Sequence, residues 1–178
     1  MKVLSGGVTA AKGFEAASVK AQIKYQNRKD MALVYSQVPC VVAGTFTTNV
    51  VKAAPVKWDQ EVVKNSPFAQ AVVVNSGIAN ACTGAEGYGY CEKTAQVAER
   101  LLGIPASAVL VASTGVIGMQ LPIERIEAGV ALLAESLSDS EEAGLEAARA
   151  IMTTDTQPKY VAVQVEIGGK MVTVGGMC

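Results

Sequence analysis

The chain has 178 residues, of which half are hydrophobic, 17% are charged and only 5% are aromatic, so its length and composition suit one domain with an aliphatic core. Its net charge is −1, and we expect no basic cluster, which argues against nucleic-acid binding because that function requires grouped Lys and Arg. No apolar run reaches the roughly 18 residues of a membrane span, and the N-terminus lacks the apolar stretch of a secretory signal.

Short strands are predicted in the first half of the chain. Residues 32–35 and 40–43 are expected to form two strands that are separated by a turn at Pro39. Residues 71–74 are wholly apolar, which is typical of a strand that is buried on both faces. We expect this strand to end where the polar residues 75–77 begin.

A helix is predicted over residues 92–102, with Gly103 at its C-terminal end. The glycines before it, Gly84, Gly87 and Gly89, invite comparison with a dinucleotide-binding loop. Their spacing differs from G-x-G-x-x-G, and no acidic residue follows at the distance that binding of a ribose requires. A dinucleotide site is therefore not predicted.

The segment from Val109 to Gly118 carries the strongest local indication of chemistry. Four apolar residues, 109–112, predict a buried strand, and the chain is then expected to turn at Ser113-Thr114-Gly115. Such a turn exposes the Thr114 hydroxyl together with the backbone N–H groups near Gly115. These are the donors of an oxyanion hole, although the same pattern also suits a plain turn.

Two helices and a hairpin are predicted in the last third. The first helix covers residues 123–136, and the second begins with a capping box that pairs Ser138 with Glu141 or Asp139 with Glu142. Residues 160–167 then alternate between apolar and other side chains, and Gly168-Gly169 predicts the turn of a hairpin. The valines of this segment are expected on one face, against a core.

The chain contains no His, so it cannot build a Ser-His-Asp or Cys-His catalytic unit by itself. Its four cysteines, Cys40, Cys82, Cys91 and Cys178, form no C-x-x-C pair and have no His to complete a mixed metal site. We therefore expect reduced thiols, no bound metal and a cytoplasmic location. An enzyme built on this chain must use another base or obtain one from another polypeptide.

Several blocks together resemble the bifunctional ornithine acetyltransferase/glutamate N-acetyltransferase family of arginine biosynthesis. They occur in the family's order and span nearly the whole chain. The blocks are Gly6–Phe14, Gly44–Asn49, Asn75–Gly84, Ser113–Gly118, Thr153–Thr156 and Val174–Met177. Ile78 departs from the family pattern, which usually has a further Asn there.

This resemblance implies a precursor that cleaves itself before a Thr, which becomes the nucleophile at the N-terminus of a second, β, chain. The 178 residues are similar to the first, α, chain, although they stop at Cys178, before a family segment that carries a substrate-binding Lys. Thr114 and Gly115 match the oxyanion-hole pair of the family, and Thr153 matches a substrate-binding Thr. The α-amino group of the N-terminal Thr would serve as the base, which accounts for a site without His.

The implied reaction moves the acetyl group from N2-acetylornithine to glutamate through an acyl-enzyme, and some members also accept acetyl-CoA as donor. No cofactor is implied. The expected fold is α/β, with mixed sheets sandwiched by helices, and residues 1–178 form one domain that the β chain completes in a heterotetramer or a larger assembly. Two alternatives stay open, namely a self-cleaving aminopeptidase of related fold and a non-catalytic domain that binds a small molecule.

Overall fold

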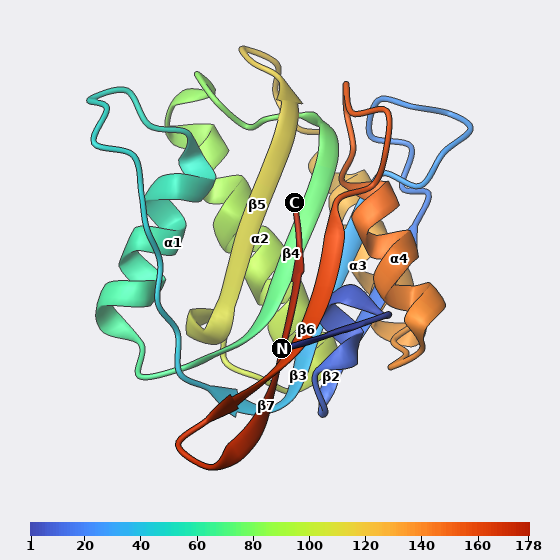
Figure 1. Cartoon of the computed structure of the whole chain (residues 1–178). Coiled ribbons are helices and arrows are strands. Elements are labelled where there is room, and N and C mark those ends of the chain that lie inside the picture. The colour runs from blue at the N-terminus through green and yellow to red at the C-terminus, as the bar shows by residue number, and fades with distance from the viewer.

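Two β-sheets and four α-helices make up the chain, and the computed structural model describes all 178 residues (Figure 1). The elements in chain order are β1 (Lys2–Leu4), η1 (Gly7–Ala10), β2 (Phe14–Val19), β3 (Met31–Cys40), α1 (Ala54–Asn65), β4 (Ala69–Ile78), α2 (Gly84–Leu102), η2 (Ala106–Ala108), β5 (Val109–Val116), α3 (Ile123–Glu135), α4 (Glu141–Ala150), β6 (Tyr160–Ile167) and β7 (Lys170–Met177). One sheet has the order β2-β3-β4-β5 and the other has the order β1-β6-β7. The α/β class expected from the sequence is confirmed.

The larger sheet is mixed, because β4 and β5 pair in parallel, whereas β2 pairs with β3 and β3 with β4 in the antiparallel direction. The expected end of β4 before residue 75 is wrong, since the strand continues to Ile78. The turn expected at residues 113–115 is also wrong, because β5 continues to Val116. Both polar segments stay extended because they pair with each other in register, residues 75–78 against 113–116.

The strand expected over residues 32–35 is part of a longer strand, β3, which passes through Pro39 and ends at Cys40. Its pairing with β4 is irregular between Tyr35 and Cys40, and Pro39 lies in this interval. Proline lacks a backbone N–H and is tolerated in sheets where the ladder is interrupted. Residues 41–43, which were predicted to belong to a strand, have no regular structure.

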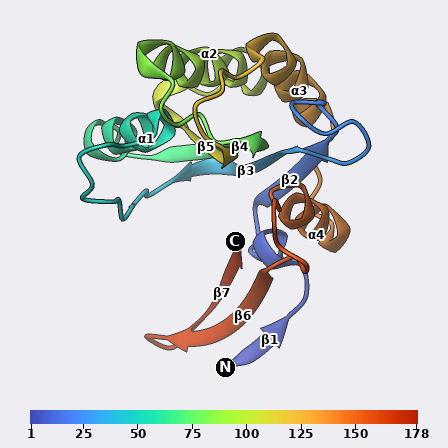
Figure 2. The ribbon, with the colours of Figure 1, turned by 90° about the horizontal axis from the view of Figure 1, so that it is seen from above.

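Helices α2 and α3 lie over one face of the larger sheet, and α1 lies beside its β5 edge (Figure 2). The main hydrophobic cluster fills the space between this face and the helices, and the largest of its fully buried side chains are Met31, Leu33, Val73, Val109, Ile126, Val130 and Leu133. None of the four helices is long and apolar enough to cross a membrane.

The helices differ from prediction mainly at their N-termini. The helix expected from residue 92 begins at Gly84, and α1 was not predicted. The predicted capping box of α4 is wrong, because Ser140 is the N-cap and its hydroxyl accepts the Ala143 N–H at 3.2 Å. Helix α3 lies within one residue of the predicted range.

The second face of the larger sheet is only partly covered. Helix α4 packs on its β2–β3 side through Ala147 and Ala150, next to the smaller sheet. Ala32, Val74 and Ser76 on this face are buried near α4, whereas five other side chains of β3, β4 and β5 on the same face are half-buried. We call this region the open face, and it consists of Val34, Val72, Leu110, Ala112 and Thr114.

The predicted hairpin is confirmed as β6 and β7, which are joined at Gly168-Gly169 and extended by β1 on the other side of β6. One face of this sheet packs on the body of the chain, and its Ala162 is fully buried. The opposite face carries the aliphatic residues that alternation predicted, but they point outward instead of into a core. We call it the valine face, and it consists of Val3, Val161, Val163, Val165, Ile167, Val172 and Val174.

Candidate functional site

Thr114 lies near the C-terminal end of β5, with its side chain on the open face. Val109 and Val111 of the same strand point toward the helices that cover the other face, so alternation places Leu110, Ala112 and Thr114 on the open face. Ser76 of β4 is the register partner of Thr114. The Thr114 side chain is thus half-buried and accessible from the side of the sheet that lacks α2 and α3.

Gly115 has a backbone conformation that only glycine adopts without strain, with φ of 136°. A Cβ at this position would lie 2.2 Å from the carbonyl carbon of Gly77, its partner on β4. Gly77 also has a positive φ, of 106°. Gly115 therefore lets the ends of β4 and β5 approach more closely than any side chain would allow, whereas Gly77 leaves room for Lys24 and Tyr25.

The outer edge of β5 is covered along its first half only. The Trp58 indole N–H of α1 donates to the Val109 carbonyl at 2.9 Å, and the Asp59 carboxylate accepts the Val111 N–H at 2.9 Å. Since backbone groups along a strand alternate in direction, the Gly115 N–H is expected on the same outer edge, beyond α1. Its position there leaves it available to a ligand.

Asp59 and Cys91 lie near this covered edge and titrate abnormally. Burial raises the pKa of Asp59 to about 6, against the lowering effect of the Val111 N–H. Burial and the nearby Asp59 raise the pKa of Cys91 to about 12, so this thiol stays protonated. Cys91 is thus a poor nucleophile, and none of the four cysteines is in a disulfide.

Buried polar side chains fix the segment around Thr114. The Ser113 hydroxyl donates to Asn75 Oδ1 at 2.6 Å, and Asn75 Nδ2 donates to the Ile78 carbonyl at 2.9 Å. Asn75 is almost fully buried. It therefore holds β5 against the end of β4 from inside the protein.

Thr153 lies in the irregular segment after α4 and is half-buried. The structure brings this segment toward Thr114 through Ser76, whose fully buried hydroxyl donates to the Ala150 carbonyl at 2.7 Å. Ser76 is thus the register partner of Thr114 and also binds the end of the helix that precedes Thr153. Thr114 and Gly115 thus lie at the C-terminal end of β5, and Thr153 follows, three residues on, the point at which α4 is bound to β4.

A large cavity lies elsewhere, between α1, the loop before it and the start of α2. It has a volume of about 640 Å³, and Lys52, Lys57, Cys82 and Tyr88 are among its lining residues. Neither Thr114, Gly115 nor Thr153 lines it. The predicted site is instead an open surface. No group of three or more His, Cys, Asp and Glu side chains is arranged to hold a metal ion.

Comparison with known proteins gives a consistent family match. A model described as the ArgJ family matches residues 15–178. The arginine biosynthesis bifunctional protein ArgJ of Symbiobacterium thermophilum is 50% identical over 179 residues, which cover 99% of this chain but 44% of that protein. The chloroplastic ArgJ protein of Oryza sativa subsp. indica is 45% identical, with 99% and 38% covered. The chain therefore spans less than half the length of these relatives.

Two solved structures share the fold. The crystal structure of the arginine biosynthesis bifunctional protein ArgJ from Bacillus halodurans has a TM-score of 0.92 and 40% identity, and the alignment covers 99% of this chain and 93% of that chain. The structure of ornithine acetyltransferase from Mycobacterium tuberculosis complexed with ornithine has a TM-score of 0.91, 42% identity and the same coverage. These chains are thus about as long as the 178 residues described here.

Proposed function

This chain belongs to the ArgJ family, and from that premise we propose that it is the α chain of a bifunctional ornithine acetyltransferase and glutamate N-acetyltransferase. The reaction transfers the acetyl group of N2-acetylornithine to glutamate, with acetyl-CoA as a possible second donor and no bound cofactor. A Thr at the N-terminus of a partner chain, cut from the same precursor, attacks the acetyl carbonyl. Ornithine leaves, and the amine of glutamate then takes the acetyl group from the Thr ester.

We assign the oxyanion hole to Thr114 and Gly115. When the Thr attacks, the carbonyl oxygen gains negative charge, which a fixed N–H and a hydroxyl stabilise better than mobile water does. The observation that carries this assignment is the parallel pairing of residues 75–78 with 113–116. It favours a Thr114 side chain on the open face and a Gly115 N–H at the uncovered edge of β5.

Thr153 is assigned to substrate binding. Its segment is attached to the same strand ends through the bond from Ser76 to the Ala150 carbonyl. A hydroxyl at this place can donate to a substrate carbonyl or carboxylate. The base is the α-amino group of the nucleophilic Thr, whose reference pKa of about 7.7–8.0 suits proton transfer near neutral pH.

The partner chain is supported by two apolar surfaces that the α chain leaves uncovered, the open face and the valine face. Val161 and Val174 of the valine face are 55% and 52% exposed. Contiguous apolar surface of this kind marks an interaction site. The solved relatives contain a chain of this length, whereas the curated relatives are more than twice as long. We propose that residues 1–178 form one α/β domain, which the partner completes into a helix-covered sandwich.

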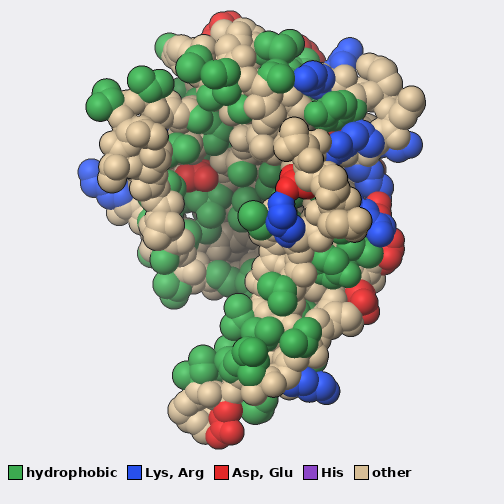
Figure 3. Space-filling model, turned by 45° about the horizontal axis from the view of Figure 1, so that its top comes forward, with side chains coloured by type: hydrophobic (Ala, Val, Ile, Leu, Met, Phe, Trp, Pro, Cys, Tyr) green, Lys and Arg blue, Asp and Glu red, His purple; other side chains and the backbone are tan.

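The two surfaces border on one another away from the site. A hollow of about 350 Å³ is lined by Val34 of the open face, Val174 of the valine face and Phe14, whereas Thr114, Gly115 and Thr153 do not line it. Figure 3 shows hydrophobic side chains on the projecting hairpin and around the hollowed centre. The heterotetrameric or larger assembly and the cytoplasmic location stay predictions, and the rice relative is by name a chloroplast protein.

The first test uses the complete protein, purified with any chain that accompanies this one. N-terminal sequencing of the second chain should give Thr, and mass spectrometry after addition of N2-acetylornithine should show one acetyl group on that Thr. Any other first residue, or an acetyl group located elsewhere, would contradict the proposal. Glutamate should then discharge the acetyl-enzyme faster than water does, which distinguishes a transferase from a peptidase.

A further inference from the structure

The loop between β2 and β3 carries four cationic residues, Lys20, Lys24, Arg28 and Lys29. The expectation that the chain has no basic cluster is therefore wrong for this loop. Among the four, only Lys29 pairs with a carboxylate, that of Glu146 at 3.0 Å. The positive charges of the other three are not neutralised within the chain, so they remain available to an anion.

The loop is held rigidly by a buried acid. Asp30 is fully buried, and its two carboxylate oxygens accept the N–H groups of Ala21 and Ile23, each at 2.7 Å. Within the loop, Arg28 lies over the Tyr25 ring with its guanidinium carbon 4.7 Å from the ring centre, and the Lys24 ammonium is 5.9 Å from the same centre. An aromatic ring placed this way attracts cations and brings these two together.

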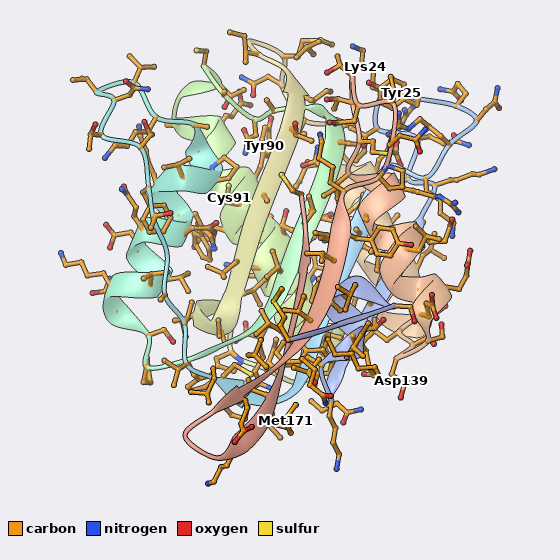
Figure 4. All side chains as sticks on the ribbon, in the orientation of Figure 1. Lys24, Tyr25, Tyr90, Cys91, Asp139 and Met171 are labelled. Atoms are coloured by element: carbon orange, nitrogen blue, oxygen red, sulfur yellow. The ribbon has the colours of Figure 1, made fainter.

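Each cation contacts the neighbour of a proposed site residue. A Cβ on Gly77 would lie 2.9 Å from Lys24 Cβ, and Gly77 is the register partner of Gly115. The Arg28 guanidinium donates to the Met152 carbonyl, next to Thr153 in the chain. Figure 4 shows Lys24 and Tyr25 of the β2–β3 loop near the end of β4. The pair therefore lies at the rim of the proposed site.

We propose that Lys24 and Arg28 form a subsite for the side-chain carboxylate of the acceptor amino acid. This inference rests on the proposed function. The donor N2-acetylornithine carries a positive ammonium group on its side chain, whereas glutamate carries a negative carboxylate. Because the α-carboxylate is common to both, a cationic pair that meets the side chain favours the acceptor and repels the donor. The pair thus favours glutamate over ornithine as the amine that discharges the acetyl-enzyme.

The test separates the half-reactions in the complete enzyme. The donor step is followed by mass spectrometry of the acetyl-enzyme, and the acceptor step by its discharge with increasing glutamate. Lys24→Gln and Arg28→Gln should each raise the KM for glutamate roughly tenfold, the effect of one charge-assisted contact. The KM for N2-acetylornithine should stay the same or fall. Raising the salt from 20 to about 200 mM should weaken glutamate binding in the wild type more than in the double variant.

Lys20→Gln is the matched control, because it removes an exposed charge from the same loop without touching Tyr25. It should change the KM for glutamate less than twofold. Equal increases for both substrates would assign the pair to the α-carboxylate and overturn the proposal, as would changes below twofold in the double variant. If the wild-type enzyme forms no acetyl-enzyme, the proposed function itself fails, and the subsite falls with it.

Discussion

Thr114 and Gly115 would both donate a hydrogen bond to the oxyanion, yet only one of them can be tested by substitution. The Thr114 side chain is half-buried on the open face. Gly115 cannot accept a Cβ, because the Gly77 backbone occupies that space. A Gly115→Ala variant would therefore report on the packing of two strands instead of on a backbone amide. The hydroxyl of Thr114 is the group that mutagenesis can remove cleanly.

Thr114→Ala should lower the turnover of acetyl transfer by about 10²- to 10³-fold, the usual cost of one oxyanion donor. The variant should keep its thermal unfolding midpoint, because the substitution removes only a methyl and a hydroxyl group from a half-buried side chain. Thr114→Ser retains the hydroxyl and should recover most of the activity. A turnover of Thr114→Ala within twofold of wild type would remove this residue from the mechanism.

Thr114 and Gly115 could be identified from the sequence as candidate site residues, because they follow the four apolar residues of a predicted buried strand. The sequence did not allow their backbone to be described. Whether residues 113–116 turn or stay extended depends on pairing with residues 75–78, which lie far away in the chain. The roles of Asn75 and Ser76 were hidden for the same reason, because their partners are distant in sequence.

Among the elements, β5 depends on α1 to cover part of its edge. Helix α1 covers the first half of an otherwise bare strand edge, using the Trp58 indole and the Asp59 carboxylate. An uncovered edge of this length would invite pairing with other chains. The cost is a partly buried carboxyl group whose pKa is raised to about 6.

The raised pKa of Asp59 predicts a definite dependence of stability on pH. Because the folded protein holds the proton more tightly than the unfolded chain, the associated stability is full below about pH 4 and is lost as the pH rises through about 6. Asp59→Asn keeps an acceptor for the Val111 N–H and carries no charge. It should therefore stabilise the protein by about 1–2 kcal/mol at pH 7.5, after allowance for solvent screening, and have little effect at pH 4.

Urea unfolding of the complete protein at both pH values would measure this difference. Glu61→Gln is the control, since it removes a charge from an exposed position of the same helix. A similar change in both variants would attribute the effect to the charge of the helix. A loss of stability in Asp59→Asn at pH 7.5 would contradict the prediction.

Local pattern predicted some elements well and others poorly. The hairpin and α3 repeat a clear period over many residues, so both were found. Helix α1 was missed, although Pro55 in its first turn is a signal that could have revealed it. Strand β3 was divided in two because Pro39 suggested a turn, whereas the sheet accommodates it at an irregular pairing.

At the level of the whole molecule, the valine face is where the burial predicted from the sequence and the exposure in the structure disagree. Alternation predicted a face buried against a core, and the structure exposes it. Both are reconciled if the missing core belongs to the partner chain. The pattern shows that burial is required but cannot show which polypeptide provides it.

Two substitutions in β7 would test this reading of the valine face. Val174 and Met171 are 52% and 59% exposed and point to opposite faces of the same sheet. Val174→Lys should weaken the association of the two chains and lower the unfolding midpoint of the complete protein by several degrees, because it would bury a charge. Met171→Lys should leave both nearly unchanged. Analytical ultracentrifugation and thermal unfolding would measure both effects. If the two substitutions had equal effects, a partner on the valine face would be contradicted.

The exposed valines also bear on the sequence of events during biogenesis. If the α chain were synthesised alone, its hairpin would expose an apolar surface. Such a surface binds chaperones or leads to aggregation. Synthesis as the proposed single precursor would avoid this hazard, because the segment that covers the hairpin would be tethered to it and present at high effective concentration. Folding would then come first and cutting second, so that the cleavage releases a new terminus inside an assembly that is already closed.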